Sequence, residues 1–329
     1  MLPVLCALLV VDAPLAGAVL VVDPGHGGQR YSRSYTGGTR GVNSKLTESE
    51  LNLRVGLALA TKLEVAGATV HRTRTCDRRL SREGSSTSDE LHARVDHFDK
   101  FNPHVFVSIH HNAGGPTASG HTALYKHNAA DPTLYEACAR AFNDALDGAV
   151  PGPKRALIGP TGNYHILRET EVPGTITEGG FQTNPGFDEE SSRPDYPERE
   201  AAALLKGAVA YWAAHKPALV ALRDKRVPKP GRVTATDLDP TFQAEMAKLL
   251  ERVAPGGSYT AAKAPDYVAA FKGTLADPAG FAVTAAASGE TIKLAGRVTD
   301  KGHHDRLIDL FVAMKLVALD NGVELPAEK

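Results

Sequence analysis

The chain has 329 residues, of which 42% are hydrophobic and 23% are charged, and its formal net charge is -1. This composition is typical of a globular protein with room for one large core and a second small domain. The near-neutral charge excludes the strongly basic surface of a nucleic-acid binder. No apolar segment reaches the roughly 18 residues that a membrane span requires.

The first 18 residues allow two interpretations. Leu5–Val11 is a short apolar segment, and Ala16–Ala18 has the small-x-small pattern of a signal-peptidase site. A basic start is missing, and Asp12 interrupts the apolar character. Residues 1–18 are therefore interpreted either as a secretory signal or as an N-terminal extension packed on the domain.

Cysteines are few. The chain contains Cys6, Cys76 and Cys138, and no pair has the CxxC spacing of a cysteine metal site. Signal cleavage would remove Cys6. Cys76 and Cys138 would then either form a disulfide or remain two buried thiols, and the sequence leaves both states open.

The first buried strand leads to a histidine. Val19–Val22 is apolar and rich in valine, and Asp23-Pro24-Gly25 then turns the chain. His26 lies on this turn among glycines. Open α/β sheets bind their ligands at the carboxyl ends of their strands, so His26 is a candidate functional residue.

A helix with clear periodicity follows over Thr47–Glu64, and Thr47 with Glu50 has the pattern of a capping box. Because this box occupies Glu50, we expect Glu48 to point outward from the helix start. Its carboxylate either serves a site or is simply favoured there by the helix macrodipole. A strand over Thr69–Thr73 comes next.

A second strand also leads to histidines. A helix over Asp89–Phe101 precedes the strand Val105–Ile109, which runs into His110 and His111. Neighbouring side chains of a strand point to opposite faces, so the two histidines cannot both face one site if the strand continues.

A third strand, Pro173–Thr177, leads to Glu178 and two glycines. Three further elements are expected here: a strand over Gly120–Lys126 and helices over Asp131–Leu146 and Pro197–Ala214. Strands alternating with helices predict an α/β fold, with a mostly parallel twisted sheet covered by helices on both faces. His26, His110 and Glu178 then share one edge of the sheet.

The composition divides the chain into parts. Residues 19–215 form the α/β domain, residues 216–232 have the Pro, Lys and Arg content of a linker, and residues 233–329 form a small α+β domain of unknown role. We expect three elements in the last part: a helix over Pro240–Val253, a hairpin of Gly280–Ala286 with Thr291–Val298, and a helix over His303–Leu319.

Two histidines with a carboxylate are a donor set of catalytic zinc, which uses three protein ligands and keeps a fourth position for water. His26, Glu48 and His110 are the candidate ligands of one zinc ion, with Glu178 as the candidate proton carrier. From spacing alone, the alternative of two structural histidines and two solvated acids stays open.

Five motifs occur in order: VVDPGHGG at 21–28, ESELNL at 48–53, TR with a following Asp at 73–77, SIHHNA at 108–113 and TEGGFQTNP at 177–185. Together they resemble the zinc-dependent N-acetylmuramoyl-L-alanine amidases of bacterial cell-wall hydrolysis. The resemblance covers roughly residues 19–214. Each motif is moderately specific, and their common order is the stronger signal.

The resemblance implies zinc held by His26, Glu48 and His110, and Glu178 as catalytic acid/base. It selects Glu48 because the acid of the family lies four residues before an asparagine, here Asn52. The implied reaction is hydrolysis of the amide between N-acetylmuramic acid and L-alanine. Peptidoglycan in the periplasm or outside the cell is then the substrate, and the small domain is a candidate contact with the wall or with a protein partner.

Weaker candidates for substrate binding are Arg74, Asn112 and Asn184. Arg74 either binds a substrate carboxylate or pairs with Asp77. The two asparagines either contact substrate or hold turns through bonds from side chain to backbone. His111 stands where a small residue is usual in the family, and we expect it to face away from the zinc.

Two other functions stay open at this point. One is a zinc peptidase or deacylase that uses the same site on another amide. The other is a catalytically inactive protein that binds peptidoglycan. Zinc content and the chemistry of the products distinguish the three.

Overall fold

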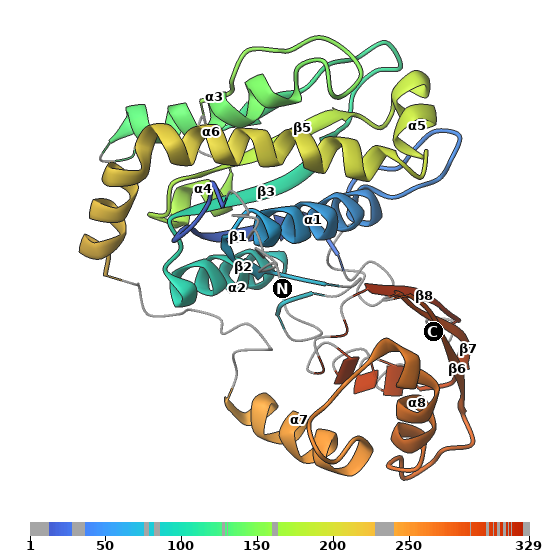
Figure 1. Cartoon of the computed structure of the whole chain (residues 1–329). Coiled ribbons are helices and arrows are strands. Elements are labelled where there is room, and N and C mark those ends of the chain that lie inside the picture. The colour runs from blue at the N-terminus through green and yellow to red at the C-terminus, as the bar shows by residue number, and fades with distance from the viewer. Residues whose placement is uncertain are drawn as a thin grey trace, which may run out of the picture.

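The computed structural model describes residues 13–27, 37–75, 79–81, 86–126, 129, 131–159, 164–227, 240–289, 291–300, 303–304, 306–307, 310–311, 314, 316 and 318–324 (Figure 1). The predicted signal before Ala13, together with Cys6 and Cys76, lies outside these ranges. Cys138 is a buried free thiol. Among the helices described, none is both long and apolar enough to cross a membrane.

The larger domain is built on a five-stranded sheet with the order β2-β1-β3-β5-β4. Its strands are β1 (Val19–Pro24), β2 (Thr69–Arg72), β3 (Val105–Asn112), β4 (Thr122–Leu124) and β5 (Gly174–Phe181). β1 pairs in parallel with β2 and β3, β3 pairs in parallel with β5, and only β4 is antiparallel to its neighbour. The mostly parallel sheet predicted from the sequence is confirmed.

Helices cover both faces of this sheet (Figure 1). They are α1 (Glu48–Val65), α2 (Thr87–Phe101), α3 (Pro132–Leu146), α4 (His165–Glu169), α5 (Pro185–Ser191) and α6 (Tyr196–Lys225). Alternate residues of the strands supply two separate cores. Val22 and Val107 pack with α1, α3 and α6, whereas Val21 and Phe106 pack with α2 and α4. This alternation is the period of a strand that is buried on both faces.

Three elements extend well beyond their predicted ends, and the strand β4 is shorter than predicted. β3 and β5 continue through Asn112 and Phe181, so the polar residues of the site lie within the strands rather than after them. β4 covers only Thr122–Leu124 of the expected strand. α6 continues to Lys225 with Pro217 inside it, and therefore takes in part of the predicted linker. Packing explains this extension, because Leu219 is fully buried in the core.

The predicted capping box at the start of α1 is only half formed. The Thr47 side chain accepts a hydrogen bond from the Glu50 backbone N–H at 3.3 Å. The Glu50 carboxylate, however, pairs with Arg54 one turn further along the helix. A complete capping box occurs instead on α2, between Ser86 and Asp89.

The smaller domain has its own sheet and core. Its elements are α7 (Pro240–Val253), a 3-10 turn (Ala261–Lys263), α8 (Ala264–Lys272), β6 (Phe281–Ser288), β7 (Thr291–Val298) and β8 (Ala318–Glu324), with the strand order β6-β7-β8. The predicted helix and hairpin are present. The predicted final helix is wrong at its end, because Ala318 and Leu319 belong to β8 and pair in parallel with β7.

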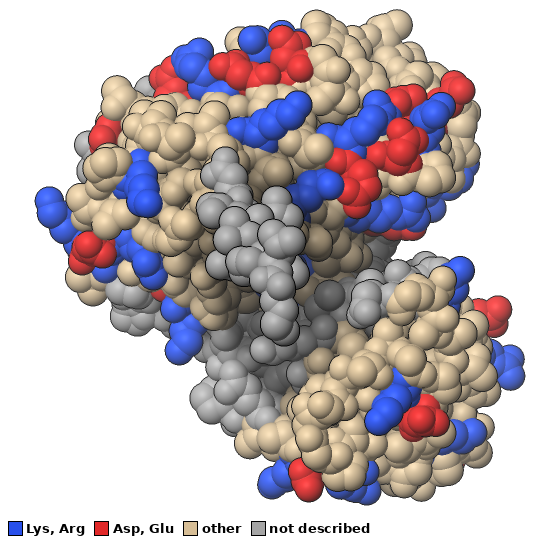
Figure 2. All heavy atoms as spheres, in the orientation of Figure 1, with Lys and Arg blue, Asp and Glu red and all other residues tan. Residues whose placement is uncertain are grey.

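Charged side chains are interspersed on the surface of the larger domain. Figure 2 shows basic and acidic residues next to one another over much of the face drawn. Ion pairs of this domain include Arg54 with Glu50 on α1, and Lys62 of α1 with Glu198 of α6 at 2.7 Å. The arrangement agrees with the formal net charge of -1.

Candidate active site

A turn held by two buried arginines presents His26. Its backbone has a φ of 60°, in the left-handed region that non-glycine residues rarely adopt. Arg74 Nε donates to the Pro24 carbonyl at 2.9 Å, and Arg74 Nη2 donates to the Gly25 carbonyl at 2.9 Å. Arg94 Nη2 donates to the carbonyl of His26 itself at 2.6 Å. These bonds offset the strain of the turn and fix the backbone that carries the imidazole.

Asp23, on β1 inside the sheet, compensates the positive charge of the buried Arg94. Its carboxylate accepts hydrogen bonds from Thr73 Oγ1 and Ser108 Oγ, both at 2.6 Å, and pairs with Arg94 at 2.5 Å. Burial opposes ionisation of this group. The Arg94 charge and the hydroxyl donors outweigh burial and hold the pKa of Asp23 below its ordinary value.

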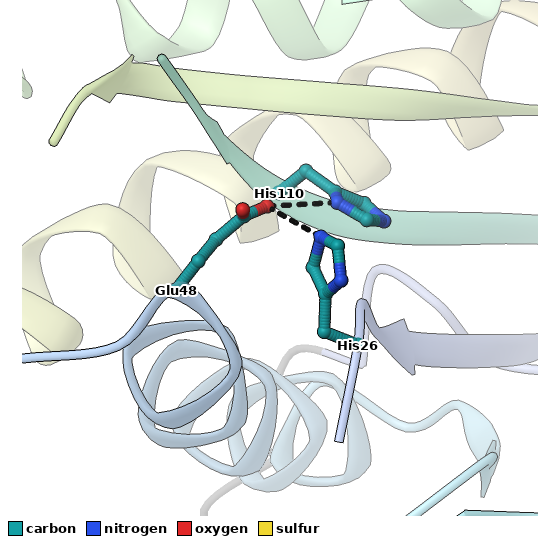
Figure 3. A group of neighbouring side chains, drawn as sticks. All are labelled: His26, Glu48 and His110. Carbon is teal, nitrogen blue, oxygen red and sulfur yellow. Dashed lines mark hydrogen bonds and ion pairs between the residues drawn. The ribbon is translucent and has the colours of Figure 1, made fainter. Parts of the chain in front are cut away.

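His26, Glu48 and His110 converge from three elements (Figure 3). Glu48 Oε1, at the start of α1, lies 2.9 Å from His110 Nδ1 and 3.1 Å from His26 Nε2. One donor atom from each residue lies within 4.8 Å of the other two. The histidine side chains are about one-fifth exposed, whereas that of Glu48 is 6% exposed. The cluster therefore opens to solvent on its imidazole side.

Backbone groups hold the Glu48 carboxylate in place. The N–H of Thr39 donates to Oε2 at 2.9 Å, and the N–H of His111 donates to Oε1 at 3.2 Å. Burial disfavours the charge of Glu48, but hydrogen bonds from both histidines hold its pKa well below the ordinary value. Burial also lowers the pKa of His26, which favours the neutral imidazole that binds metal ions.

Two glycines make room for the cluster. A Cβ on Gly25 would lie 2.1 Å from His110 Nε2, and a Cβ on Gly38 would lie 2.1 Å from Glu48 Oε2. Both distances are far below van der Waals contact. Gly25, the first glycine of the DPGHGG motif, is therefore required for the position of His110, although His110 lies far away in the sequence.

Glu178 lies beside the cluster on β5, where it is the register partner of His110. Its Oε2 is buried and has no hydrogen-bond partner among the described residues. Burial, with a further contribution from the charge of Glu48, raises the pKa of Glu178 to about 8. A carboxyl group with a strongly raised pKa next to a donor cluster is typical of a catalytic acid or base.

The other predicted site residues make hydrogen bonds within the protein. Arg74 is 1% exposed, and its guanidinium donates to the carbonyl groups of Pro24, Gly25 and Ser49, which favours the structural alternative over contact with substrate. Asn112 Oδ1 accepts from the N–H of Ala113. Asn184 caps α5 and also donates to the Ala118 carbonyl at 3.0 Å. The alternative partner of Arg74, Asp77, lies outside the described residues.

Sequence reasoning missed Arg94, which binds both Asp23 and the turn of His26. A signal for it was present. Arg94 lies on the face of α2 that also buries Glu90 and Phe98, so a charged residue occupies a core position of an amphipathic helix. A charge at such a position requires a buried partner.

His111 faces away from the cluster, as expected from strand alternation. Its Nδ1 lies 2.7 Å from Asn52 Oδ1, and its Nε2 lies 3.0 Å from Glu200 Oε2 on α6. Burial lowers the pKa of His111, but the charge and hydrogen bond of Glu200, together with the charges of Glu48 and Glu178, outweigh burial and raise this pKa above its ordinary value.

A two-histidine, one-carboxylate centre with a neighbouring acid, at the carboxyl edge of an α/β sheet, is characteristic of metal-dependent hydrolases. The sequence model of the N-acetylmuramoyl-L-alanine amidase family matches residues 20–210, which is more than half of the chain. The chain therefore belongs to this family of enzymes that hydrolyse peptidoglycan. The match ends before the smaller domain begins.

Individual relatives agree with this assignment. The chain is 29% identical over 205 residues to the germination-specific N-acetylmuramoyl-L-alanine amidase of Bacillus subtilis, covering 60% of this chain and 81% of that protein. It is 31% identical over 177 residues to the "Probable cell wall amidase LytH" of Staphylococcus aureus, covering 52% of this chain and 50% of that protein. An N-acetylmuramoyl-L-alanine amidase from Clostridium difficile 630 has a similar structure, with a TM-score of 0.50, 28% identity, and coverage of 60% of this chain and 97% of that one.

Proposed function

We propose that this protein hydrolyses the amide between the lactyl group of N-acetylmuramic acid and L-alanine of the stem peptide, with zinc held by His26, Glu48 and His110. Glu178 is the proposed acid/base. The observation that carries the proposal is the convergence of three donor atoms within 4.8 Å beside Glu178, whose Oε2 atom is buried and has no hydrogen-bond partner among the described residues.

The donor set fits zinc in its chemistry. Two imidazoles and a carboxylate are ligands that zinc accepts, and three protein ligands leave a position for water. The partial exposure of His26 and His110 gives that position access to solvent. Zinc bound in such a site lowers the pKa of its water to about 7 and polarises a carbonyl group.

Glu178 supplies the proton transfers. Its carboxylate takes a proton from the attacking water, and the hydroxyl group bonds to the lactyl carbonyl carbon. The carbon–nitrogen bond then breaks, and Glu178 returns the proton to the leaving amine of L-alanine. One water is consumed, and a free amine and a free carboxylate result. Cation binding at the cluster offsets the charge of Glu48, which otherwise raises the pKa of Glu178.

The proposed function also implies where the protein acts and what its domains do. The substrate lies in the cell envelope, so the protein acts in the periplasm or outside the cell, with residues 1–18 as its signal or extension. Residues 19–215 form the catalytic domain, and residues 216–232 lead to a domain at 233–329 that contacts the wall or a protein partner. The family match over residues 20–210 supports the extent of the catalytic domain.

Mass spectrometry of peptidoglycan digests tests the proposal. The purified chain is incubated with peptidoglycan, with and without a zinc chelator, beside Glu178→Ala. Release of stem peptides with a free L-alanine amine, from intact glycan and only by the zinc-loaded wild type, is the expected result. Internally cleaved peptides would instead indicate a peptidase. Absence of both products and bound zinc would refute the site.

A further inference from the structure

Behind the ligand cluster lies a buried polar pair that the proposed reaction does not use. His111 and Glu200 both have side chains that are 0% exposed, and their Nε2 and Oε2 atoms lie 3.0 Å apart. The pair joins β3 to α6, and the His111 ring lies beside that of Phe187, a residue of the apolar core. Two apolar side chains of similar volume would join these elements at least as well, because burying an ion pair costs desolvation. Its presence at this point calls for a specific role.

The first connection of the pair leads to His26 and Glu48. His111 Nδ1 lies 2.7 Å from Asn52 Oδ1, and Asn52 Nδ2 donates to the Gly25 carbonyl at 3.2 Å, next to His26. The backbone N–H of His111 donates to Glu48 Oε1, the oxygen that faces both histidines. Any shift of His111 would therefore move groups that hold two of the proposed ligands.

The second connection leads to Glu178 through the residue that follows it. A Cβ on Gly179 would lie 2.5 Å from Glu200 Oε1 and 3.0 Å from His111 Nε2. The backbone of β5 thus packs directly on the pair, beside the proposed acid/base. His111 is also the chain neighbour of His110. Glu48, His110 and Glu178 thus contact the pair, adjoin it in the sequence or adjoin a residue packed on it, and His26 is linked to it through Asn52 and the Gly25 carbonyl.

We infer that Asn52, His111 and Glu200 form a positioning unit, which fixes the spacing of the metal ligands through hydrogen bonds that an apolar pair could not make. The inference rests on the proposed function, since it concerns the zinc that His26, Glu48 and His110 would hold. None of the three residues touches substrate. Groups that orient metal ligands are commonly worth 10- to 100-fold in metal affinity.

The opposite end of β3 provides a matched control. His104 precedes β3, is 2% exposed, and accepts a hydrogen bond from the Val19 N–H at 3.0 Å. Its ring packs edge-on against Trp212 of α6, with the ring centroids 4.9 Å apart. His104 therefore links the same strand to the same helix, but at the end away from the ligand cluster. His104→Ala weakens this packing without touching the site.

The test measures zinc affinity by competition with a chelator, together with the thermal stability of the metal-free protein. In the double variant His111→Leu/Glu200→Met, the dissociation constant for zinc should rise about 10- to 100-fold, while the metal-free protein stays folded. Glu200→Gln keeps an acceptor for His111 and should stay within about threefold of the wild type. His104→Ala should lower stability and leave zinc affinity unchanged.

Asn52→Ala is a second variant that keeps the test valid if the double variant does not fold. It leaves the contact between His111 and Glu200 intact, and it removes both the bond from Asn52 to the Gly25 carbonyl and the contact of Asn52 with His111 Nδ1. It should also weaken zinc binding. Unchanged zinc affinity in Asn52→Ala and in the double variant would overturn the inference while the proposed function stands. A wild-type protein that binds no zinc would overturn the proposed function, and this inference with it.

Discussion

Replacement of Glu178 by Gln should have two effects of opposite sign, one on catalysis and one on stability. Gln has nearly the same size and shape as a protonated Glu but carries no ionisable proton. Hydrolysis by the zinc-loaded enzyme should fall by about 10²–10⁴-fold, which is the usual contribution of a general acid or base. The metal-free variant should be more stable than the metal-free wild type at alkaline pH.

The size and sign of the stability effect follow from the pKa of Glu178. The pKa is raised from 4.5 to about 8, so between these values the folded protein holds a proton that the unfolded chain has released. The free energy of unfolding of the wild type therefore falls as pH rises through this window. At about 1.4 kcal/mol per pKa unit, the penalty reaches at most about 5 kcal/mol above pH 8. Glu178→Gln removes this penalty.

Urea unfolding of both metal-free proteins, with a chelator present and between about pH 5 and pH 9, measures this difference. All other titrating groups are common to the two proteins, so their contributions largely cancel. The advantage of Glu178→Gln should be small near pH 5 and should grow steadily up to pH 8. A difference that stays constant with pH would refute the raised pKa, and retention of full activity would refute the catalytic role.

Four further predictions can be checked with standard assays. Removal of zinc by chelation should abolish release of stem peptides, and added zinc should restore it while circular dichroism stays unchanged. Gly25→Ala should displace His110 and abolish metal binding measured by equilibrium dialysis, whereas Gly115→Ala, which has open space around it, should bind metal normally. Arg74→Ala should lower the free energy of unfolding by about 3–5 kcal/mol, because buried carbonyl groups lose their donors. Asn184→Ala should cost about 1 kcal/mol through loss of its helix cap and leave KM within twofold, whereas a large rise in KM would restore it as a substrate contact.

Most of the local structure of the larger domain could be predicted from the sequence. Apolar runs and helical periodicity located the strands and the four long helices of the larger domain, but not the short helices α4 and α5. The polar residues at three strand ends indicated the same edge of the sheet. His26, Glu48 and His110 could be proposed in this way because their positions depend on strand ends and a helix start. The reasoning from the capping box was less accurate, because Glu50 pairs with Arg54 instead of completing the box. The Glu48 carboxylate nevertheless points away from its own helix and into the cluster, where it is buried.

Other features depended on the tertiary structure. Arg74 follows a strand in a motif, where exposure is a natural expectation, but the packing of α1 and the turn over it buries its guanidinium. The extent of α6 depended on the burial of Leu219, and β8 depended on pairing with β7. Periodicity describes one element at a time, so it contains no information on which element will cover a given side chain.

The sequence by itself determined the donor types, their order along the chain and the α/β class, because these follow from residue chemistry and from short-range backbone preferences. Only the tertiary structure decided that Arg94 and Asp23 support the turn of His26, and that His111 meets Glu200 in the core. The physical reason is that a buried charge is stable only beside its partner, and these partners are brought together from distant parts of the chain by the packing of helices on the sheet.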